Sequence, residues 1–178
     1  ILIEPWSEDG SAPLAFSQLH ARLAGEGSAQ RIEDLQLTSP WGEARLSAGL
    51  DTGVFPHGLM AEGTARAIVD ERKFLFRYDV RGDLSRLELR VTGEGESLAG
   101  DADAQLAPFE PFPLLGARVA LQGLDPAAFV GGVPTAELGV DATLATGEDG
   151  VLEGDIAVRN ARPLRVDEGG LPFESLTS

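Results

Sequence analysis

Residues 136–159 read AELGVDATLATGEDGVLEGDIAVR, and apolar and polar residues alternate along both halves of this stretch. Alternation with a period of two places the apolar side chains on one face of a β-strand and the polar ones on the other. Between the halves, Gly147-Glu148-Asp149-Gly150 has the composition of a tight turn. The stretch therefore predicts a hairpin, with strands over Ala136–Leu144 and Leu152–Arg159, that has one apolar and one solvated face.

The same alternation recurs through the rest of the chain. The 22 glycines and 11 prolines interrupt it so often that long helices have little room. No β-α-β pattern is present, so we expect an all-β fold in which about ten strands form an antiparallel meander with one solvated face. The clear segments are Gly42–Asp51, Leu59–Asp70, Arg86–Thr92 and Leu98–Leu106, and the further predicted strands are Arg31–Thr38, Phe74–Arg81 and Ala117–Leu121.

Three stretches depart from the strand pattern. Residues 11–25 carry apolar residues at helical spacing, between a serine suited to cap a helix and a glycine suited to end it, so helix and strand both remain open. Asp125–Phe129, with proline in its second position, predicts a single helical turn capped by the aspartate. Residues 107–116 contain three prolines and predict an extended crossover or a cover over a sheet edge rather than a central strand.

The charge balance excludes several classes of partner. The 178 residues include 14 Lys plus Arg and 29 Asp plus Glu, a net charge of −15, which repels nucleic acid and disfavours an anionic membrane surface. The chain has no cysteine for a disulfide and no apolar run long enough to span a bilayer as a helix. It starts at Ile1 rather than Met and lacks a signal-peptide pattern, so we expect residues 1–178 to be a single segment of a longer protein.

Motifs for catalysis or for a cofactor are missing. His20 and His57 have no spacing that makes a metal face, and no nucleophile elbow, phosphate loop or dinucleotide fingerprint is present. Alternation places Asp101, Asp103 and Asp141 on the solvated face, where they serve solubility. Calcium at the turn around Glu148 and Asp149 lacks the spacing of a known calcium loop. We therefore expect no enzyme, no metal and no cofactor.

The predicted apolar face is built from slim residues. Nearly half of the inward positions in the six clear strands are Ala or Gly, and none is aromatic. Such a face fills a core poorly, since protein interiors are close-packed, and so it favours a hollow. The alternative is an ordinary acidic β-sandwich completed by Phe74, Phe76, Tyr78 and the Pro/Phe segment.

Two stretches resemble the TamB family, a component of the translocation and assembly module. In the first, Gly154-Asp155-Ile156-Ala157-Val158-Arg159-Asn160-Ala161-Arg162-Pro163 is followed by Asp167 and by Leu171-Pro172-Phe173-Glu174-Ser175-Leu176, which resembles a family signature of a strand ending in Val-x-Asn before a Leu-Pro. In the second, Leu35–Leu46, a Trp-Gly turn joins two amphipathic strands in a manner similar to that family. No anchor or family C-terminal tail is present, so the resemblance is to an internal fragment.

The resemblance implies a fold, a location and a role. TamB-like proteins belong with the AsmA-like, bridge-type lipid-transfer proteins, whose strands curl into a long trough with an apolar interior, the β-taco. They are anchored in the inner membrane, cross the periplasm and work with the outer-membrane barrel protein TamA. They are implicated in phospholipid transport and in outer-membrane protein assembly. On this basis we expect a curled sheet and a periplasmic segment of an inner-membrane protein.

The expected function is a lipid conduit in which an apolar groove shields phospholipid acyl chains. The alternatives are a β-augmentation module that pairs an edge strand with an outer-membrane barrel partner, and an ordinary acidic β-sandwich of a surface protein. An isolated segment could also pair edge to edge as a homodimer. The residues expected to line the groove are Leu46, Leu50, Leu59, Val69, Leu87, Leu89, Val91, Leu98, Leu106, Leu138, Val140, Leu144, Leu152, Ile156 and Val158.

Overall fold

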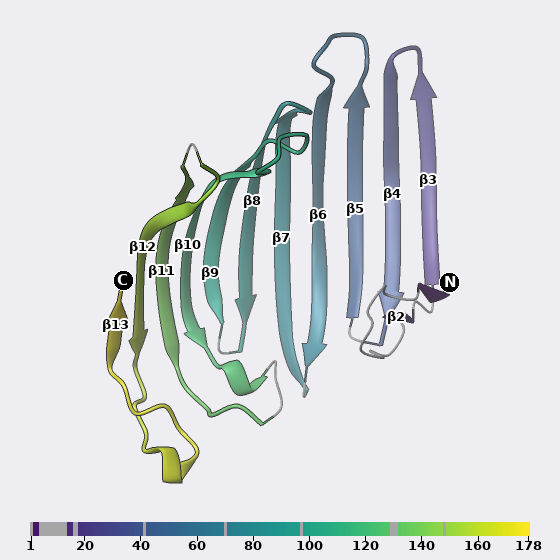
Figure 1. Ribbon diagram of the computed structural model, residues 1–178. Coiled ribbons are helices and arrows are strands. Elements are labelled where there is room, and N and C mark those ends of the chain that lie inside the picture. The colour runs from purple at the N-terminus through teal and green to yellow at the C-terminus, as the bar shows by residue number, and fades with distance from the viewer. Residues whose placement is uncertain are drawn as a thin grey trace.

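The computed structural model describes residues 2–3, 14–15, 18–40, 42–69, 71–96, 98–128, 132–147 and 149–178. Eleven strands, β3 to β13, form one open antiparallel sheet in which each strand lies beside its neighbours in the sequence (Figure 1). Two short strands, β1 (Leu2–Ile3) and β2 (Leu14–Ala15), pair separately. The strands of the sheet are β3 (Gln18–Glu26), β4 (Ala29–Ser39), β5 (Gly42–Asp51), β6 (Gly58–Val69), β7 (Arg72–Asp83), β8 (Arg86–Gly95), β9 (Ala99–Leu106), β10 (Leu114–Leu124), β11 (Leu138–Thr146), β12 (Leu152–Asn160) and β13 (Ser175–Thr177).

Alternating strands joined by short turns account for this topology. β5 has the bounds that alternation predicts, and the other predicted strands lie within a few residues of theirs. Some hairpins are as tight as two residues: Glu26 pairs with Ala29 across a turn in which Gly27 has a φ of 57°. The predicted all-β class and the curled antiparallel sheet of about ten strands are confirmed.

The N-terminal part of the sheet corrects one alternative left open by the sequence. β3 is an extended strand, so the helical interpretation is wrong over residues 18–25. Leu19 and Leu23 suit either structure because a separation of four fits both periods, and pairing with β4 selects the strand. Residues 11–13 and 16–17, which belong to the same prediction, lie outside the described residues.

The Pro-rich stretch also differs from expectation. Residues 107–113 link β9 to β10, which are neighbours in the sheet, so the connection is a loop between adjacent strands instead of the crossover expected over 107–116. The Ala107 amide donates to the Pro113 carbonyl at 2.7 Å and closes this loop. β10 then begins at Leu114, directly after the last proline, where a strand can again use every amide.

The helical turn after β10 forms as predicted. η1 (Pro126–Ala128) follows Asp125, whose Oδ1 accepts the Ala127 amide hydrogen at 3.2 Å. Phe129 lies outside the described residues. The other carboxylate oxygen, Oδ2, pairs with Arg72 Nη1 at 3.1 Å and ties the turn to the start of β7. A second 3₁₀ turn, η2 (Val166–Glu168), lies in the connection between β12 and β13.

The sheet carries no second layer among the residues that the structure describes. The strands β3 to β13 belong to one sheet, so the sandwich alternative is wrong. The chain exposes 12184 Å² of surface, whereas a compact monomer of its mass exposes about 8300 Å². Phe74, at 2 % exposed, is the most buried hydrophobic residue in the described ranges. The apolar face of the sheet is therefore only partly covered.

Candidate functional site

The register of the sheet collects the apolar residues on one face, which we call the groove face. Each cross-strand pair brings side chains of the same face together, so the pairs can be followed from strand to strand as rows. One row passes through all eleven strands and carries no polar side chain. In order, it contains Leu19, Leu37, Ala44, Ala65, Phe76, Gly93, Gly100, Leu121, Val140, Val158 and Leu176.

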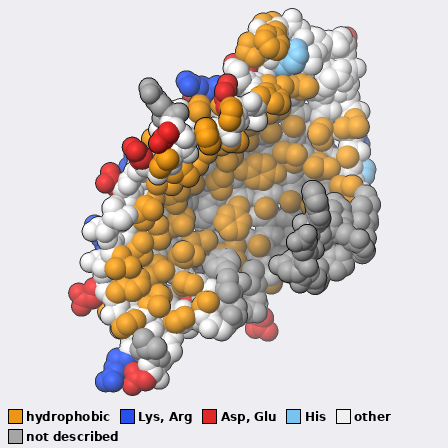
Figure 2. Space-filling view, in the orientation of Figure 1, with side chains coloured by type: hydrophobic (Ala, Val, Ile, Leu, Met, Phe, Trp, Pro, Cys, Tyr) orange, Lys and Arg blue, Asp and Glu red, His pale blue; other side chains and the backbone are white. Residues whose placement is uncertain are grey.

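Two further rows run beside the first and share its character. Each passes through ten strands, and the Tyr78 hydroxyl is the one polar side-chain group in either. The first contains Ala21, Leu35, Leu46, Gly63, Tyr78, Val91, Ala102, Val119, Ala142 and Ile156, and the second contains Leu23, Ile32, Ala48, Ala61, Val80, Leu89, Ala104, Ala117, Leu144 and Gly154. Figure 2 shows hydrophobic side chains gathered over this face, which is hollowed.

The strand register puts most of the predicted lining residues on this face. Within the described residues, Leu87, Leu98 and Leu138 are buried, and Leu98 lies just before β9 rather than in it. On β12, next to the edge strand β13, Leu152 and Ile156 are exposed. The side chain of Val69 lies outside the described part of the chain. The remaining predicted residues are half-buried: Leu46, Leu50, Leu59, Leu89, Val91, Leu106, Val140, Leu144 and Val158.

Three aromatic residues on β7 belong to the groove face and were missing from the predicted lining. Phe74 faces Gly95 and Phe76 faces Gly93 across the β7–β8 pair, while Tyr78 faces Gly63 on β6. Gly93 and Gly95 both lie within β8. The matching two-residue spacing of the phenylalanines and of these glycines, placed symmetrically about a hairpin turn, is the signal that could have identified the pairs.

The aromatic rings lie close to the glycines that they face. A Cβ added to Gly93 would be 3.1 Å from two atoms of the Phe76 ring, and one added to Gly95 would be 2.5 Å from Phe74 Cδ1. A Cβ at Gly63 would collide with the Tyr78 hydroxyl and with the Arg45 carbonyl oxygen. Glycine at these positions therefore gives each ring room to lie low on the sheet.

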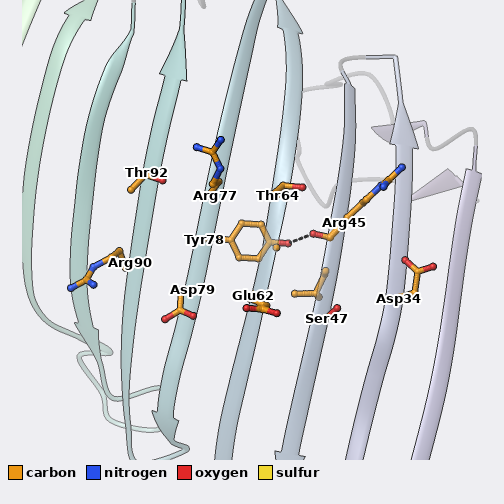
Figure 3. Close-up of a pocket in the computed structure, with 12 residues that line it drawn as sticks. Asp34, Arg45, Ser47, Glu62, Thr64, Arg77, Tyr78, Asp79, Arg90 and Thr92 are labelled. Atoms are coloured by element: carbon orange, nitrogen blue, oxygen red, sulfur yellow. Dashed lines mark hydrogen bonds between the residues drawn. The ribbon is translucent and has the colours of Figure 1, made fainter.

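The opposite face of the sheet is charged. Cross-strand ion pairs join Arg77 Nη2 to Glu94 Oε1 at 2.9 Å and Arg90 Nε to Asp103 Oδ1 at 2.7 Å. The hydrogen bond that Arg90 Nε donates to the Asp103 carboxylate raises the pKa of the Arg90 guanidinium above its ordinary value. Figure 3 shows that the polar side chains around a pocket in this part of the sheet are spread over β4 to β8 instead of gathering about one point. This geometry suits a solvated face.

The residues considered for catalysis or metal binding lie apart. His20 is exposed on β3, and His57 Nδ1 lies 3.0 Å from the Val54 carbonyl oxygen in the loop between β5 and β6. Asp149 Oδ1 accepts the Val151 amide hydrogen at 3.1 Å, while Glu148 lies outside the described residues. Over the described ranges, no three acidic, histidine or cysteine side chains lie close enough to share a metal ion.

Two further observations complete the description of the chain. None of the helical segments that the structure describes is long and apolar enough to cross a membrane. Searches with the chain against protein-family models, curated proteins and solved structures find no match.

Proposed function

We propose that this chain is a non-enzymatic segment of a lipid conduit, in which the groove face shields phospholipid acyl chains from water. The observation that carries the proposal is the row from Leu19 to Leu176, which crosses all eleven strands without a polar side chain. An acyl chain needs no specific hydrogen bond, only continuous apolar contact. A contiguous apolar surface of this extent, with no layer over it in the described residues, is typical of a binding surface.

The energetics favour an apolar occupant. Covering one methylene group contributes about 0.8 kcal/mol, and covering a Leu or Val side chain contributes about 1.5–3 kcal/mol. Leu46, Leu89 and Val140 are only half-buried. An acyl chain lying over them would therefore gain the contribution of its own methylene groups and that of these side chains. The charged headgroup would remain in water at the open side of the groove, where its hydration is retained.

The proposed setting follows from the resemblance to TamB-like proteins. We place the segment in the periplasm, within an inner-membrane protein that acts with an outer-membrane barrel of the TamA type. Eleven strands spaced by about 4.8 Å give a path of roughly 50 Å along the rows. Several such segments, arranged end to end, would connect two membranes, and the charged outer face would keep them soluble.

Lipid extraction tests this function with paired variants. Wild-type protein is incubated with vesicles of phosphatidylethanolamine and phosphatidylglycerol that contain a fluorescent phospholipid, re-isolated and examined by native mass spectrometry. We expect bound phospholipid in the wild type. Leu89→Arg and Val140→Glu each place a charge within a groove row, and we expect each to reduce occupancy about tenfold, because a charge cannot be buried against acyl chains without a large cost.

The controls place the same charges on the outer face of the same strands. Thr92→Arg on β8 and Thr143→Glu on β11 are exposed, so they should keep wild-type occupancy. Circular dichroism checks that all four variants fold. Absence of phospholipid from the wild type, or equal occupancy in groove and outer-face variants, would contradict the proposal.

A second candidate function, β-augmentation, is favoured by the edge strand β3. Among the described residues it pairs with β4 on one side only, and its nine residues are all exposed. Such an edge can add a strand of a partner, here a TamA-type barrel. Consecutive backbone amides point to opposite sides of a strand. Of the two variants His20→Pro and Ala21→Pro, one therefore removes an amide that points away from β4 and leaves the β3–β4 hydrogen bonds in place. Binding of the purified barrel should fall in one variant with lipid occupancy unchanged, and unchanged binding in both would contradict this role.

A further inference from the structure

The three aromatic residues on β7 lie across the path that the rows of the groove face define. Phe76 belongs to the row through eleven strands, and Tyr78 belongs to the neighbouring row. Phe74 occupies the next groove-face position on the same strand. Because the rows run from strand to strand, an acyl chain that moves along either row from the β3 side to the β12 side must cross β7 at one of these rings.

The three rings are held at a low position by their surroundings. Phe74 is 2 % exposed and lies against Gly95. The Tyr78 hydroxyl donates a hydrogen bond to the Arg45 carbonyl oxygen at 3.0 Å, reaching across β6 to β5, so the ring spans Gly63 (Figure 3). Burial raises the pKa of Tyr78 above its ordinary value, so the phenol keeps the proton that this hydrogen bond needs.

The residues beside the rings are small on both sides. On β6, Ala65 faces Phe76 and Ala67 faces Phe74. On β8, the residues facing the two phenylalanines are glycines, whose missing side chains leave the space that the rings use. Because their neighbours are small, these large rings can lie close to the sheet and obstruct the groove little.

We propose that Phe74, Phe76 and Tyr78 form an aromatic band that sets the depth of the groove at β7, and that the glycines beneath the rings determine how much acyl chain can cross it. This inference rests on the proposed lipid-conduit function. The band is a specificity-determining element: it admits a layer of acyl chain over flat rings, and a raised ring narrows the passage.

Gly93 is the position at which the band can be tested without disturbing the backbone. The atoms close to a Cβ at Gly93 belong to the Phe76 ring, whereas a Cβ at Gly63 would also meet the Arg45 backbone. Gly93→Ala and the larger Gly93→Val should lift the Phe76 ring into the groove. We expect a fall in apparent lipid affinity of about fourfold for Gly93→Val, the factor that one fewer buried methylene gives.

A second substitution separates the ring position from a general effect of losing glycine. Phe76→Leu combined with Gly93→Val removes the lifted ring and should restore affinity to near the wild-type value. Gly49→Ala is the matched control, because a Cβ there meets nothing within 4 Å. A phospholipid with a photoactivatable acyl chain reports position, and peptides from β7 should lose cross-links in Gly93→Val and regain them in the double variant.

The outcomes distinguish the band from the conduit. Wild-type affinity and cross-linking in both Gly93→Ala and Gly93→Val, with lipid bound, would overturn the band and leave the conduit intact. Failure of the double variant to recover, while circular dichroism and the urea midpoint match the wild type, would overturn it too. If Gly93→Val does not fold, the milder Gly93→Ala decides. Absence of lipid from the wild type would instead overturn the proposed function on which the band depends.

Discussion

The two faces of the sheet are made by the same strands and have opposite chemistry. On β8, Leu89 and Val91 face the groove, while Arg90 between them lies on the outer face and pairs with Asp103. The chemical character of the outer face varies from position to position. Its exposed ion pairs are local, and each contributes little to stability. The groove face is uniform along its rows. A binding surface can therefore depend on the continuity of its apolar side chains instead of on any single reactive residue.

The largest expected difference between the faces is in stability. Leu138 on the groove face is 8 % exposed, whereas Met60 on the outer face is 65 % exposed. Leu138→Ala should lower the free energy of unfolding by about 2–4 kcal/mol because it removes buried contacts and leaves a cavity. Met60→Ala should change it by less than about 0.5 kcal/mol. Urea denaturation measures both, and similar losses in the two variants would contradict the assignment of the faces.

A smaller effect is expected at Asn160, a buried polar residue at the end of β12 on the groove side. Its Oδ1 accepts the amide hydrogens of Glu137 at 3.3 Å and Arg162 at 3.1 Å, and its Nδ2 donates to the Leu171 carbonyl oxygen at 3.0 Å. Asn160→Ala leaves these backbone groups without partners and should cost about 1–3 kcal/mol.

The exposed Gln105 provides the control for this position, since Gln105→Ala on the outer face should leave the urea midpoint unchanged. Equal urea midpoints for Asn160→Ala and the wild type would show that the hydrogen bonds of Asn160 do not stabilise the fold.

The smallest expected effect is a pH dependence at the turn between β7 and β8. The Asp83 carboxylate accepts hydrogen bonds from the Ser85 hydroxyl and amide and from the Arg86 amide, and these lower its pKa from the ordinary value. A lowered pKa in the folded state stabilises the fold above the unfolded pKa of about 3.9. That contribution is lost as the pH falls through the folded pKa.

A carboxyl NMR titration tests this turn. We expect the pKa of Asp83 to lie below its ordinary value in the wild type and to rise toward it in Ser85→Ala, which removes the first of these hydrogen bonds. An unshifted value in the wild type would refute the role of the turn. The effect is small because the hydrogen bonds to this carboxylate are exposed to solvent.

Much of the fold could be predicted because alternation is a local property of the chain. The bounds of β5 and the apolar face of β11 follow from residues a few positions apart. The strand β3 could not be assigned, because Leu19 and Leu23 fit a helix as well and only pairing with β4 decides. The aromatic residues of the groove were missed for a related reason: which residue lies opposite Phe76 depends on the turn that sets the register, and not on Phe76 itself.

The order of the strands has a consequence for how such a groove could change in length. In the part of the chain that the structure describes, each strand of the sheet pairs only with the strands before and after it, so the sheet is assembled from contacts between sequence neighbours. Loss or gain of two successive strands would preserve the up-and-down order and alter the path by about 10 Å. The length of the groove can therefore change in steps of one whole hairpin.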